Sequence, residues 1–269
     1  AQVVHSPAAY EPVERIGTEK LGNHLSEPTD LFVDDKGNFY ILDKGANMIL
    51  MTDNHWNVIK EITFFQNTDT NQEDGFNAPE GLCVSADETI YVADTQNSRV
   101  VILDKNGVYK GSVTTPKSNL FDDNYSFLPT KVAVDSVGRI YVISRNDYQG
   151  ILQFNADYSF FGYMGSNQVT FNIVDMIWKK LLTEDQLNQT VQFIPVEYTN
   201  LYLDDEEFIY TVSASPTETT PIKLLNSSGD DVLLHAGYSS SIAGDEQVLA
   251  SGKGTRSTLI DICADSTGT

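Results

Sequence analysis

The chain reads Pro79-Glu-Gly-Leu-Cys-Val-Ser-Ala-Asp-Glu-Thr-Ile-Tyr91-Val-Ala-Asp94, and close variants of this stretch occur at Pro28–Asp43 and Pro129–Ser144. Each copy begins with a proline and continues with a short segment in which apolar residues alternate with others. A turn containing Asp or Gly follows, and then a second segment led by an aromatic residue. A unit that returns in this way is an internal repeat, and repeats decide the architecture before any other signal.

The tyrosines of the repeat give its period. Tyr40 and Tyr91 are 51 residues apart, and Tyr91 and Tyr141 are 50 apart. The alternation of apolar residues within each copy predicts a pair of strands. The turns Asp35–Gly37 and Asp135–Gly138 suit tight hairpins, because glycine adopts a positive φ without strain.

Further strands complete each unit. Third strands are predicted at Met48–Thr52, Arg99–Leu103 and Gly150–Phe154. The turn Asp104–Gly107 then leads to an outer strand at Tyr109–Val113. Four strands in a repeat of about 50 residues are typical of a propeller blade, so the sequence predicts an all-β propeller.

The second half of the chain departs from this period. A fourth unit, Tyr198–Ser213, places Tyr210 69 residues after Tyr141, and a fifth unit begins at Leu259 and stops at Thr269. The long interval predicts a helical insertion over residues 172–189, with a capping box at Thr183–Gln186. This insertion is either a lid or partner surface, or a packing helix over one face.

The predicted domain organisation is a single propeller over residues 1–269, with four blades and part of a fifth. The segment Ala9–Leu25 is predicted to be a lone outer strand before the first complete blade. Because an open blade edge invites aggregation, we expect the propeller to be truncated at its C-terminus.

Composition limits the classes of partner. The formal net charge is −21 and the isoelectric point is about 4.3, so nucleic acids and anionic membrane surfaces are not expected partners. We expect no direct membrane insertion, because no apolar run approaches the length of a membrane span. Cys83 and Cys263 are predicted to be small buried hydrophobes, too far apart for a disulfide.

The stretch Asp94-Thr-Gln-Asn97-Ser-Arg99, together with the repeat that contains it, resembles the NHL repeat. That resemblance implies an NHL-type propeller in which the Asp, Asn and Arg near the end of the second strand brace the blade. The first unit keeps Asp43 and Asn47 but has Met48 and Ile49 where the arginine is expected.

Three other passages resemble a narrower group of proteins. They are Ala9–Val13, Trp178–Asn200 and Ile222–Gly229. They are similar to bacterial membrane proteins whose extracytoplasmic NHL propeller precedes the transmembrane helices of a Yip1-like domain. This resemblance implies an extracellular or cell-surface location, with secretion or an anchor outside this chain. The start at Ala1-Gln2 fits a processed N-terminus.

The candidate site lies at the mouth of the central channel, where side chains follow the conserved start of each innermost strand. Its candidate binding residues are Asp30, Glu80, Lys131, Asn200 and Asp261. Their oxygen atoms suit a cation such as calcium, but Lys131 would oppose one. The alternative interpretation is that these are polar residues lining a wet channel. No cofactor is expected, no metal ligand set is assigned and calcium is a minor alternative.

Three classes of function stay open at this point. The first is an extracytoplasmic binding or sensing scaffold that uses a propeller face for a protein or carbohydrate partner, without an assigned catalytic residue. The resemblance also implies a divalent-metal hydrolase or lyase of the gluconolactonase type, and a structural spacer is the third class. Aromatic residues in the loops and outer strands either stack on a partner or pack between blades. These residues are Phe64, Phe65, Phe76, Tyr125, Phe127, Tyr158, Phe160, Phe161 and Tyr163.

Overall fold

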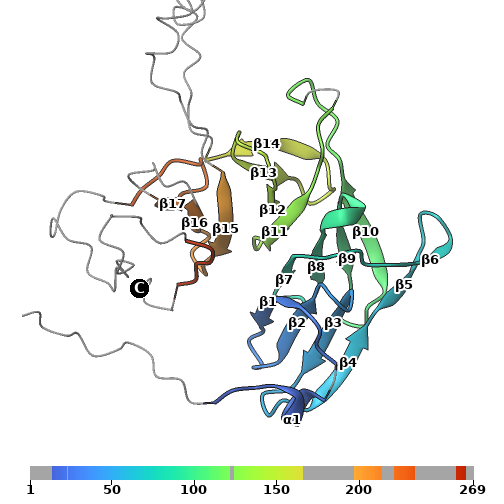
Figure 1. Cartoon of the computed structure of the whole chain (residues 1–269). Helices are drawn as coiled ribbons and strands as arrows, with labels where there is room; N and C mark the ends of the chain where they lie inside the picture. The colour runs from blue at the N-terminus through green and yellow to red at the C-terminus, as the bar shows by residue number, and fades with distance from the viewer. Residues whose placement is uncertain are drawn as a thin grey trace, which may run out of the picture.

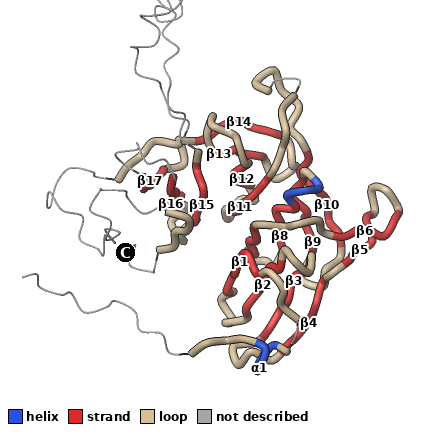
Figure 2. Tube along the Cα trace, viewed as in Figure 1, coloured by secondary structure: helices blue, strands red, loops and turns tan. Residues whose placement is uncertain are grey.

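A computed structural model describes residues 14–22, 24–121, 124–165, 197–213, 221–233 and 259–264. These residues form an almost entirely β structure, in which sheets follow one another around an arc (Figures 1 and 2). The predicted insertion at residues 172–189 lies outside the described residues. The described part contains no helix long and apolar enough to cross a membrane.

Each repeat forms one antiparallel sheet, or blade, in which strands pair in the order of the sequence. Blades 1 to 3 have four strands each, and blade 4 has three within the described residues. The all-β propeller prediction is therefore confirmed. The strands of blade 1 are β1 (Pro28–Val33), β2 (Phe39–Asp43), β3 (Met48–Thr52) and β4 (Val58–Ile62), and those of blade 2 are β7 (Gly81–Val84), β8 (Ile90–Asp94), β9 (Arg99–Leu103) and β10 (Tyr109–Thr114). Blade 3 contains β11 (Pro129–Val134), β12 (Ile140–Ser144), β13 (Ile151–Phe154) and β14 (Phe160–Met164), and blade 4 contains β15 (Tyr198–Leu203), β16 (Ile209–Ser213) and β17 (Ile222–Leu225).

The aspartates in the turns between strands form hydrogen bonds within those turns. The side chain of Asp34 accepts hydrogen bonds from the backbone N–H groups of Lys36 and Asn38, at 2.9 and 2.8 Å. Asp204 accepts the corresponding N–H groups of Glu206 and Phe208, at 3.0 and 2.9 Å. Such carboxylates are used to close their own turns. This is the structural reason for Asp at these positions, and it does not require calcium.

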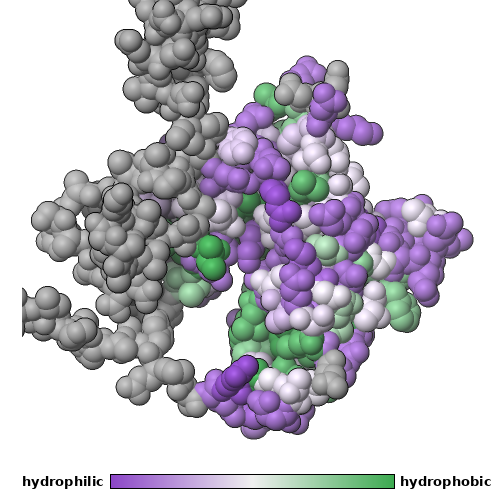
Figure 3. All heavy atoms as spheres, viewed as in Figure 1, coloured by the Kyte–Doolittle hydropathy of each residue, from purple (hydrophilic) through white to green (hydrophobic). Residues whose placement is uncertain are grey.

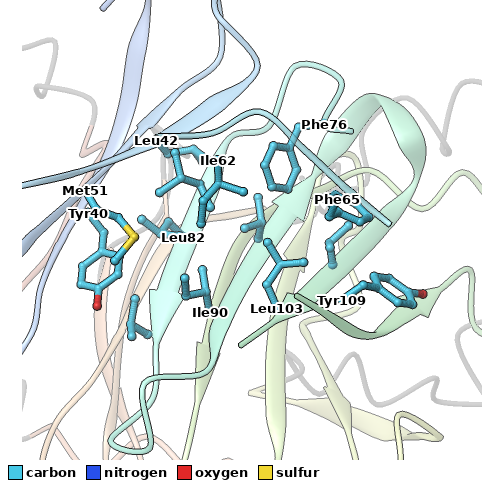
Figure 4. Close-up of a cluster of buried hydrophobic side chains, with 14 residues drawn as sticks. Tyr40, Leu42, Met51, Ile62, Phe65, Phe76, Leu82, Ile90, Leu103 and Tyr109 are labelled. Atoms are coloured by element: carbon cyan, nitrogen blue, oxygen red, sulfur yellow. The ribbon is translucent and has the colours of Figure 1, made fainter. Parts of the chain in front are cut away.

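The core lies between the blades. One cluster joins blades 1 and 2 and includes Tyr40, Leu42, Leu82 and Ile90 (Figure 4). A second cluster joins blades 2 and 3, and a third joins blades 3 and 4. The inner strands of blades 2 and 3 thus bury one face against the preceding blade and the other against the following blade. This arrangement explains why strands such as β8 are buried along their whole length.

Three short elements were absent from the sequence prediction. A hairpin of β5 (Phe64–Asn67) and β6 (Gln72–Gly75) connects blades 1 and 2, and the 3₁₀ turn η1 (Thr95–Asn97) follows β8. The third is α1 (Thr18–Leu21), a single helical turn. The prediction of a lone outer strand over Ala9–Leu25 was wrong in its described part, because residues 18–21 form the helical turn α1 and Leu21 packs on Ile41, Met48 and Leu50 of blade 1.

The two cysteines have different environments. Cys83 is buried in the cluster between blades 2 and 3, and burial raises the pKa of its thiol to about 12. Cys263 is exposed, so the prediction that it is buried was wrong. It occupies the repeat position of Cys83 and Ala133, whose side chains are covered by the following blade. Among the described residues, no blade follows residues 259–264 to cover Cys263 in the same way.

Candidate functional site

The innermost strands β1, β7, β11 and β15 surround a cavity of about 830 Å³. Asp30, Lys131 and Asn200 line it, together with residues 262–264 of the fifth unit. A β-bulge occurs at the same place in three blades, between Pro28 and Asp30, between Pro129 and Lys131, and between Tyr198 and Asn200. Bulges re-aim side chains, which accounts for the channel-facing position of these three residues.

Asp30 of blade 1 and Lys131 of blade 3 form an ion pair along the channel wall. Lys131 Nζ lies 2.9 Å from Asp30 Oδ1, and Asp30 Oδ2 accepts the backbone N–H of Leu82 at 2.8 Å. Burial raises the pKa of Asp30 and outweighs the opposing effects of Lys131 and of these hydrogen bonds. The side chains of Asp30 and Lys131 are only 14% and 16% exposed, so this pair is a desolvated part of the channel wall.

Glu80 forms a second charged group, with cations on both sides. Lys44 Nζ lies 2.9 Å from Glu80 Oε1, and Arg145 Nη2 contacts Glu80 Oε2. Burial acts to raise the pKa of Glu80, but the hydrogen bonds and charges of Lys44 and Arg145 hold it below its ordinary value. Glu80, Lys44 and Arg145 are not part of the cavity lining but lie at the end of the blades where β1 and β11 begin and β2 and β12 end. We refer to these three residues, together with Asp30 and Lys131 of the lining, as the channel mouth.

Sequence reasoning missed Lys44 and Arg145. Each comes directly after the last residue of a second strand, Asp43 and Ser144, and so at the same end as the start of the first strand. An alignment of the repeats at the residue after the second strand would have found both. That position holds Lys44 in the first repeat, Thr95 in the second and Arg145 in the third, so two of the three repeats place a cation there.

Asn200, which lines the same cavity as Asp30 and Lys131, pairs with Asp261 of the fifth unit. Asn200 Nδ2 donates to Asp261 Oδ1 at 2.6 Å and to the backbone carbonyl of Ile260 at 3.3 Å. These contacts hold residues 259–264 beside β15. Of the five predicted site residues, Asp30, Lys131 and Asn200 therefore line the cavity, whereas Glu80 and Asp261 are outside its lining. Asp30 pairs with Lys131, Asn200 with Asp261, and Glu80 with Lys44 and Arg145.

Another charged network braces blade 2. Arg99 Nε lies 2.9 Å from Asp94 Oδ2, and Arg99 Nη1 lies 2.6 Å from Asp74 Oδ2. Asn97 Nδ2 also donates to Asp94 Oδ2, at 2.9 Å. This is the bracing arrangement of Asp, Asn and Arg that the resemblance to the NHL repeat implied, extended by Asp74 from the hairpin β5–β6.

The family model of the NHL repeat matches residues 76–103, which include β7, β8 and β9. The fold is an NHL-type β-propeller. A comparison with curated protein sequences finds no match.

Solved structures are similar to this NHL-type propeller at low sequence identity. Hydrazine synthase of Kuenenia stuttgartiensis is 11% identical with a TM-score of 0.50, over 83% of this chain and 51% of its own. Virginiamycin B lyase of Staphylococcus aureus is 12% identical with a TM-score of 0.44, over 78% of this chain and 70% of its own. A protein of unknown function from Bacteroides caccae is 12% identical with a TM-score of 0.47, over 77% of this chain and 65% of its own. This NHL-type propeller thus spans about half the length of the hydrazine synthase chain.

Cation chemistry fits the mouth of this propeller poorly. Asp30 is held by Lys131, and Glu80 by Lys44 and Arg145, so a divalent ion would have to displace ammonium and guanidinium groups. Within the described residues, His, Cys, Asp and Glu side chains form no group of three or more that could hold a metal ion. The carboxylates are therefore arranged as partners of cationic side chains.

Most of the aromatic residues pack between blades, as one of the two interpretations predicted. Phe65, Phe76 and Phe127 are 3%, 7% and 1% exposed. Tyr125, Phe160 and Tyr163 surround Phe121 in ring contacts on blade 3. Phe64 and Phe161 are 63% and 67% exposed, but neither lines the cavity.

Proposed function

We propose that this propeller is an extracytoplasmic binding module whose channel mouth takes an acidic segment of a protein partner. The observation that carries the proposal is the composition of the mouth, where three cations surround two carboxylates in a chain of net charge −21. Lys44 and Arg145 are also 32% and 41% exposed, so both can reach a partner.

Arg145 supplies the recognition chemistry. A guanidinium presents a planar set of donors that matches a carboxylate, and such bonds are stronger than those between neutral groups. Glu80 holds Arg145 and Lys44 in place on one side and leaves donors of both free for a second carboxylate. The local positive excess would also steer an acidic ligand toward the mouth.

A protein partner is favoured over a carbohydrate by the rings that line the cavity. Sugars commonly stack on open aromatic faces, but the two lining aromatics, Phe32 and Tyr202, contact Tyr40 and Tyr210 of their own blades. The alternative class, a divalent-metal hydrolase or lyase, is disfavoured by the ion pairs of Asp30 and Glu80.

The test uses arrays of acidic and neutral peptides and of carboxylated glycans, probed with the folded chain and with two double variants. Lys44→Ala with Arg145→Ala removes the two cations around Glu80. Lys36→Ala with Lys105→Ala is the matched control, because these lysines flank Glu88 in the same way at the opposite end of the strands. We expect binding of acidic peptides to fall at least about tenfold, or about 1.4 kcal/mol, in the first variant only.

Other outcomes would overturn parts of the proposal. Equal losses in both double variants would indicate non-specific attraction, and no preference for acidic peptides would refute the site. Binding of glycans alone would replace the protein partner by a carbohydrate. Stoichiometric calcium or zinc binding by calorimetry that Asp30→Ala and Glu80→Ala abolish would favour the metalloenzyme instead.

A further inference from the structure

The hairpin of β5 and β6 has two unlike faces. It projects from the outer side of blade 2, beyond β10 (Figure 1). Phe65 of β5 lies opposite Asp74 of β6 in the register of the hairpin. Because successive side chains of a strand point to opposite faces, Phe65 and Asp74 share one face, whereas their neighbours Phe64 and Glu73 share the other.

The inner face binds an arginine of the chain itself. The guanidinium carbon of Arg99 lies 5.7 Å from the centre of the Phe65 ring. Arg99 Nη1 and Nη2 donate to the two carboxylate oxygens of Asp74, at 2.6 and 3.0 Å. One ring and one carboxylate thus hold a guanidinium by a cation–π contact and a bidentate ion pair. Phe65 is only 3% exposed, so this inner position is occupied.

The outer face carries the same two chemical groups and leaves them open. Phe64 is 63% exposed, and Glu73 is exposed as well. The contacts within the described residues leave the Phe64 ring without a second ring or a cation, and the Glu73 carboxylate without an ion pair. Phe64 pairs with Gly75 and Glu73 with Gln66, so Phe64 and Glu73 are diagonal neighbours. Such positions are roughly 7–8 Å apart, within reach of aromatic and long side chains.

Contacts with blade 2 hold the hairpin in place. The ring of Phe65 stacks on that of Tyr109, with ring centres 5.6 Å apart and planes inclined by 5°. The hydroxyl of Tyr109 donates to Asp69 Oδ2 at 2.7 Å, and Asn67 Nδ2 donates to Asp74 Oδ2 at 2.9 Å. A ligand of the outer face therefore binds a segment that is already ordered, which lowers the cost of association.

The charge around the outer face favours a cationic ligand. No Lys or Arg occurs between Lys60 and Arg99, whereas this stretch contains eight Asp and Glu residues. Figure 3 shows the hairpin as a largely hydrophilic projection. An acidic surface beside an exposed ring attracts a cation. Arginine fits better than lysine, because its planar guanidinium both stacks on a ring and donates two bonds to a carboxylate.

We propose that Phe64 and Glu73 form a docking site for an arginine side chain in an exposed segment of a partner protein. The guanidinium lies on the Phe64 ring and donates to Glu73, in the way that Arg99 uses Phe65 and Asp74 on the inner face. Neither Phe64 nor Glu73 lines the cavity. The site is therefore independent of the channel mouth, for which we propose a ligand of the opposite charge.

The test compares short Gly-Ser peptides that carry arginine, lysine or citrulline at matched positions. Citrulline keeps the planar shape of the arginine side chain but has no charge. Fluorescence anisotropy gives the affinity of each peptide for the parent chain, for Phe64→Leu with Glu73→Gln, and for Phe161→Leu with Glu19→Gln. The last variant is the matched control, because it makes the same changes at exposed positions of β14 and α1.

We expect the arginine peptide to bind the Phe64 and Glu73 variant at least about threefold more weakly than the parent chain, and to bind the control variant as the parent does. The lysine peptide should bind the parent more weakly than the arginine peptide, and the citrulline peptide most weakly. All three proteins should melt at the same temperature, because the changed side chains are exposed, so a loss of affinity is not a loss of folding.

Four outcomes would overturn the proposal. Equal affinity for the arginine and citrulline peptides would exclude recognition of a cation. Equal losses in the two variants would indicate non-specific attraction by a chain of net charge −21. Binding of neutral glycans that Phe64→Leu alone abolishes, without binding of the arginine peptide, would assign the ring to a carbohydrate. A loss of arginine-peptide binding in Lys44→Ala with Arg145→Ala would place the peptide at the channel mouth; this variant should bind it at least as tightly as the parent chain.

Discussion

Lys131 of blade 3 reaches past blade 2 to place its ammonium group 2.9 Å from the carboxylate of Asp30 in blade 1. The residue of blade 2 at the same repeat position is Gly81, which has no side chain to obstruct the pair. A Cβ at Gly81 would lie 2.5 Å from the carbonyl oxygen of Thr130 and 2.8 Å from Cα of Lys131. The ion pair and the close approach of β7 and β11 thus depend on this glycine.

Gly81→Ala should destabilise the chain by about 1–3 kcal/mol, because the added methyl group overlaps backbone atoms of β11 that cannot move independently. The measurement is urea unfolding followed by circular dichroism. Gly162→Ala is the matched control, since a Cβ there meets nothing within 4 Å. A neutral result for Gly81→Ala would show that the two strands can separate at low cost.

Lys131→Met should cost about 2 kcal/mol at pH 7, because it leaves the carboxylate of Asp30 desolvated without its cation. The pKa of Asp30 is already raised by burial, and loss of Lys131 raises it further. The folded variant then binds a proton more readily than the unfolded chain, so its deficit should shrink as the pH falls toward 4. Unfolding free energies at several pH values test this sign.

Asp30→Asn combined with Lys131→Met should recover much of the lost stability, because no charge is then left unpaired. A double variant that is no more stable than Lys131→Met alone would assign the loss to the packing of the lysine stem. A deficit that does not depend on pH would lead to the same conclusion.

Asp74→Asn should change the acid stability of the chain. Hydrogen bonds from Arg99 lower the pKa of Asp74 from 3.8 to about 2, against the opposing effect of burial. The stabilisation by this carboxylate is therefore complete above about pH 4 and is lost as the pH falls toward 2. The variant should be about 1–2 kcal/mol less stable at neutral pH and should lose less stability over that range.

Acid titration of the unfolding free energy tests the Asp74 prediction. Glu73→Gln, a charge-neutralising change at an exposed position of the same hairpin, should leave the profile close to that of the parent chain. If Asp74→Asn and Glu73→Gln have the same profile, the network of Arg99 and Asp74 does not control the loss of stability in acid.

Thr95→Val should cost about 1–2 kcal/mol, because it removes a fully buried bond of 2.7 Å from blade 2 to the carbonyl of Pro129 in blade 3. Thr29→Val removes the corresponding bond between blades 1 and 2, which is 3.3 Å long and only partly buried. Its cost should be below about 0.5 kcal/mol, since water can replace the lost donor. Thermal unfolding compares the stability lost in the two variants. Equal losses would show that the burial of a hydrogen bond does not determine how much it contributes here.

The local part of the fold was predictable from the sequence. The predicted second strands and turns match the structure closely, and Gly150–Phe154 differs from β13 by a single residue. The alternation of apolar side chains and the Asp and Gly residues of the turns act within a few residues. The strands and turns of each repeat can therefore be predicted from that repeat alone. The bracing of Asp94, Asn97 and Arg99 was predictable only from the resemblance to the NHL repeat.

The sequence by itself thus determined the all-β repeat and the end of the blades at which charged residues collect. Only the tertiary structure decided that Asp30 meets Lys131, that Glu80 meets Lys44 and Arg145, and that Asn200 meets Asp261. It also decided that Leu31 is exposed in blade 1 whereas Leu82, at the same repeat position in blade 2, is buried. The physical reason is that these contacts depend on how far one blade is rotated from the next, which is set by packing between sheets distant in the sequence and leaves no local pattern.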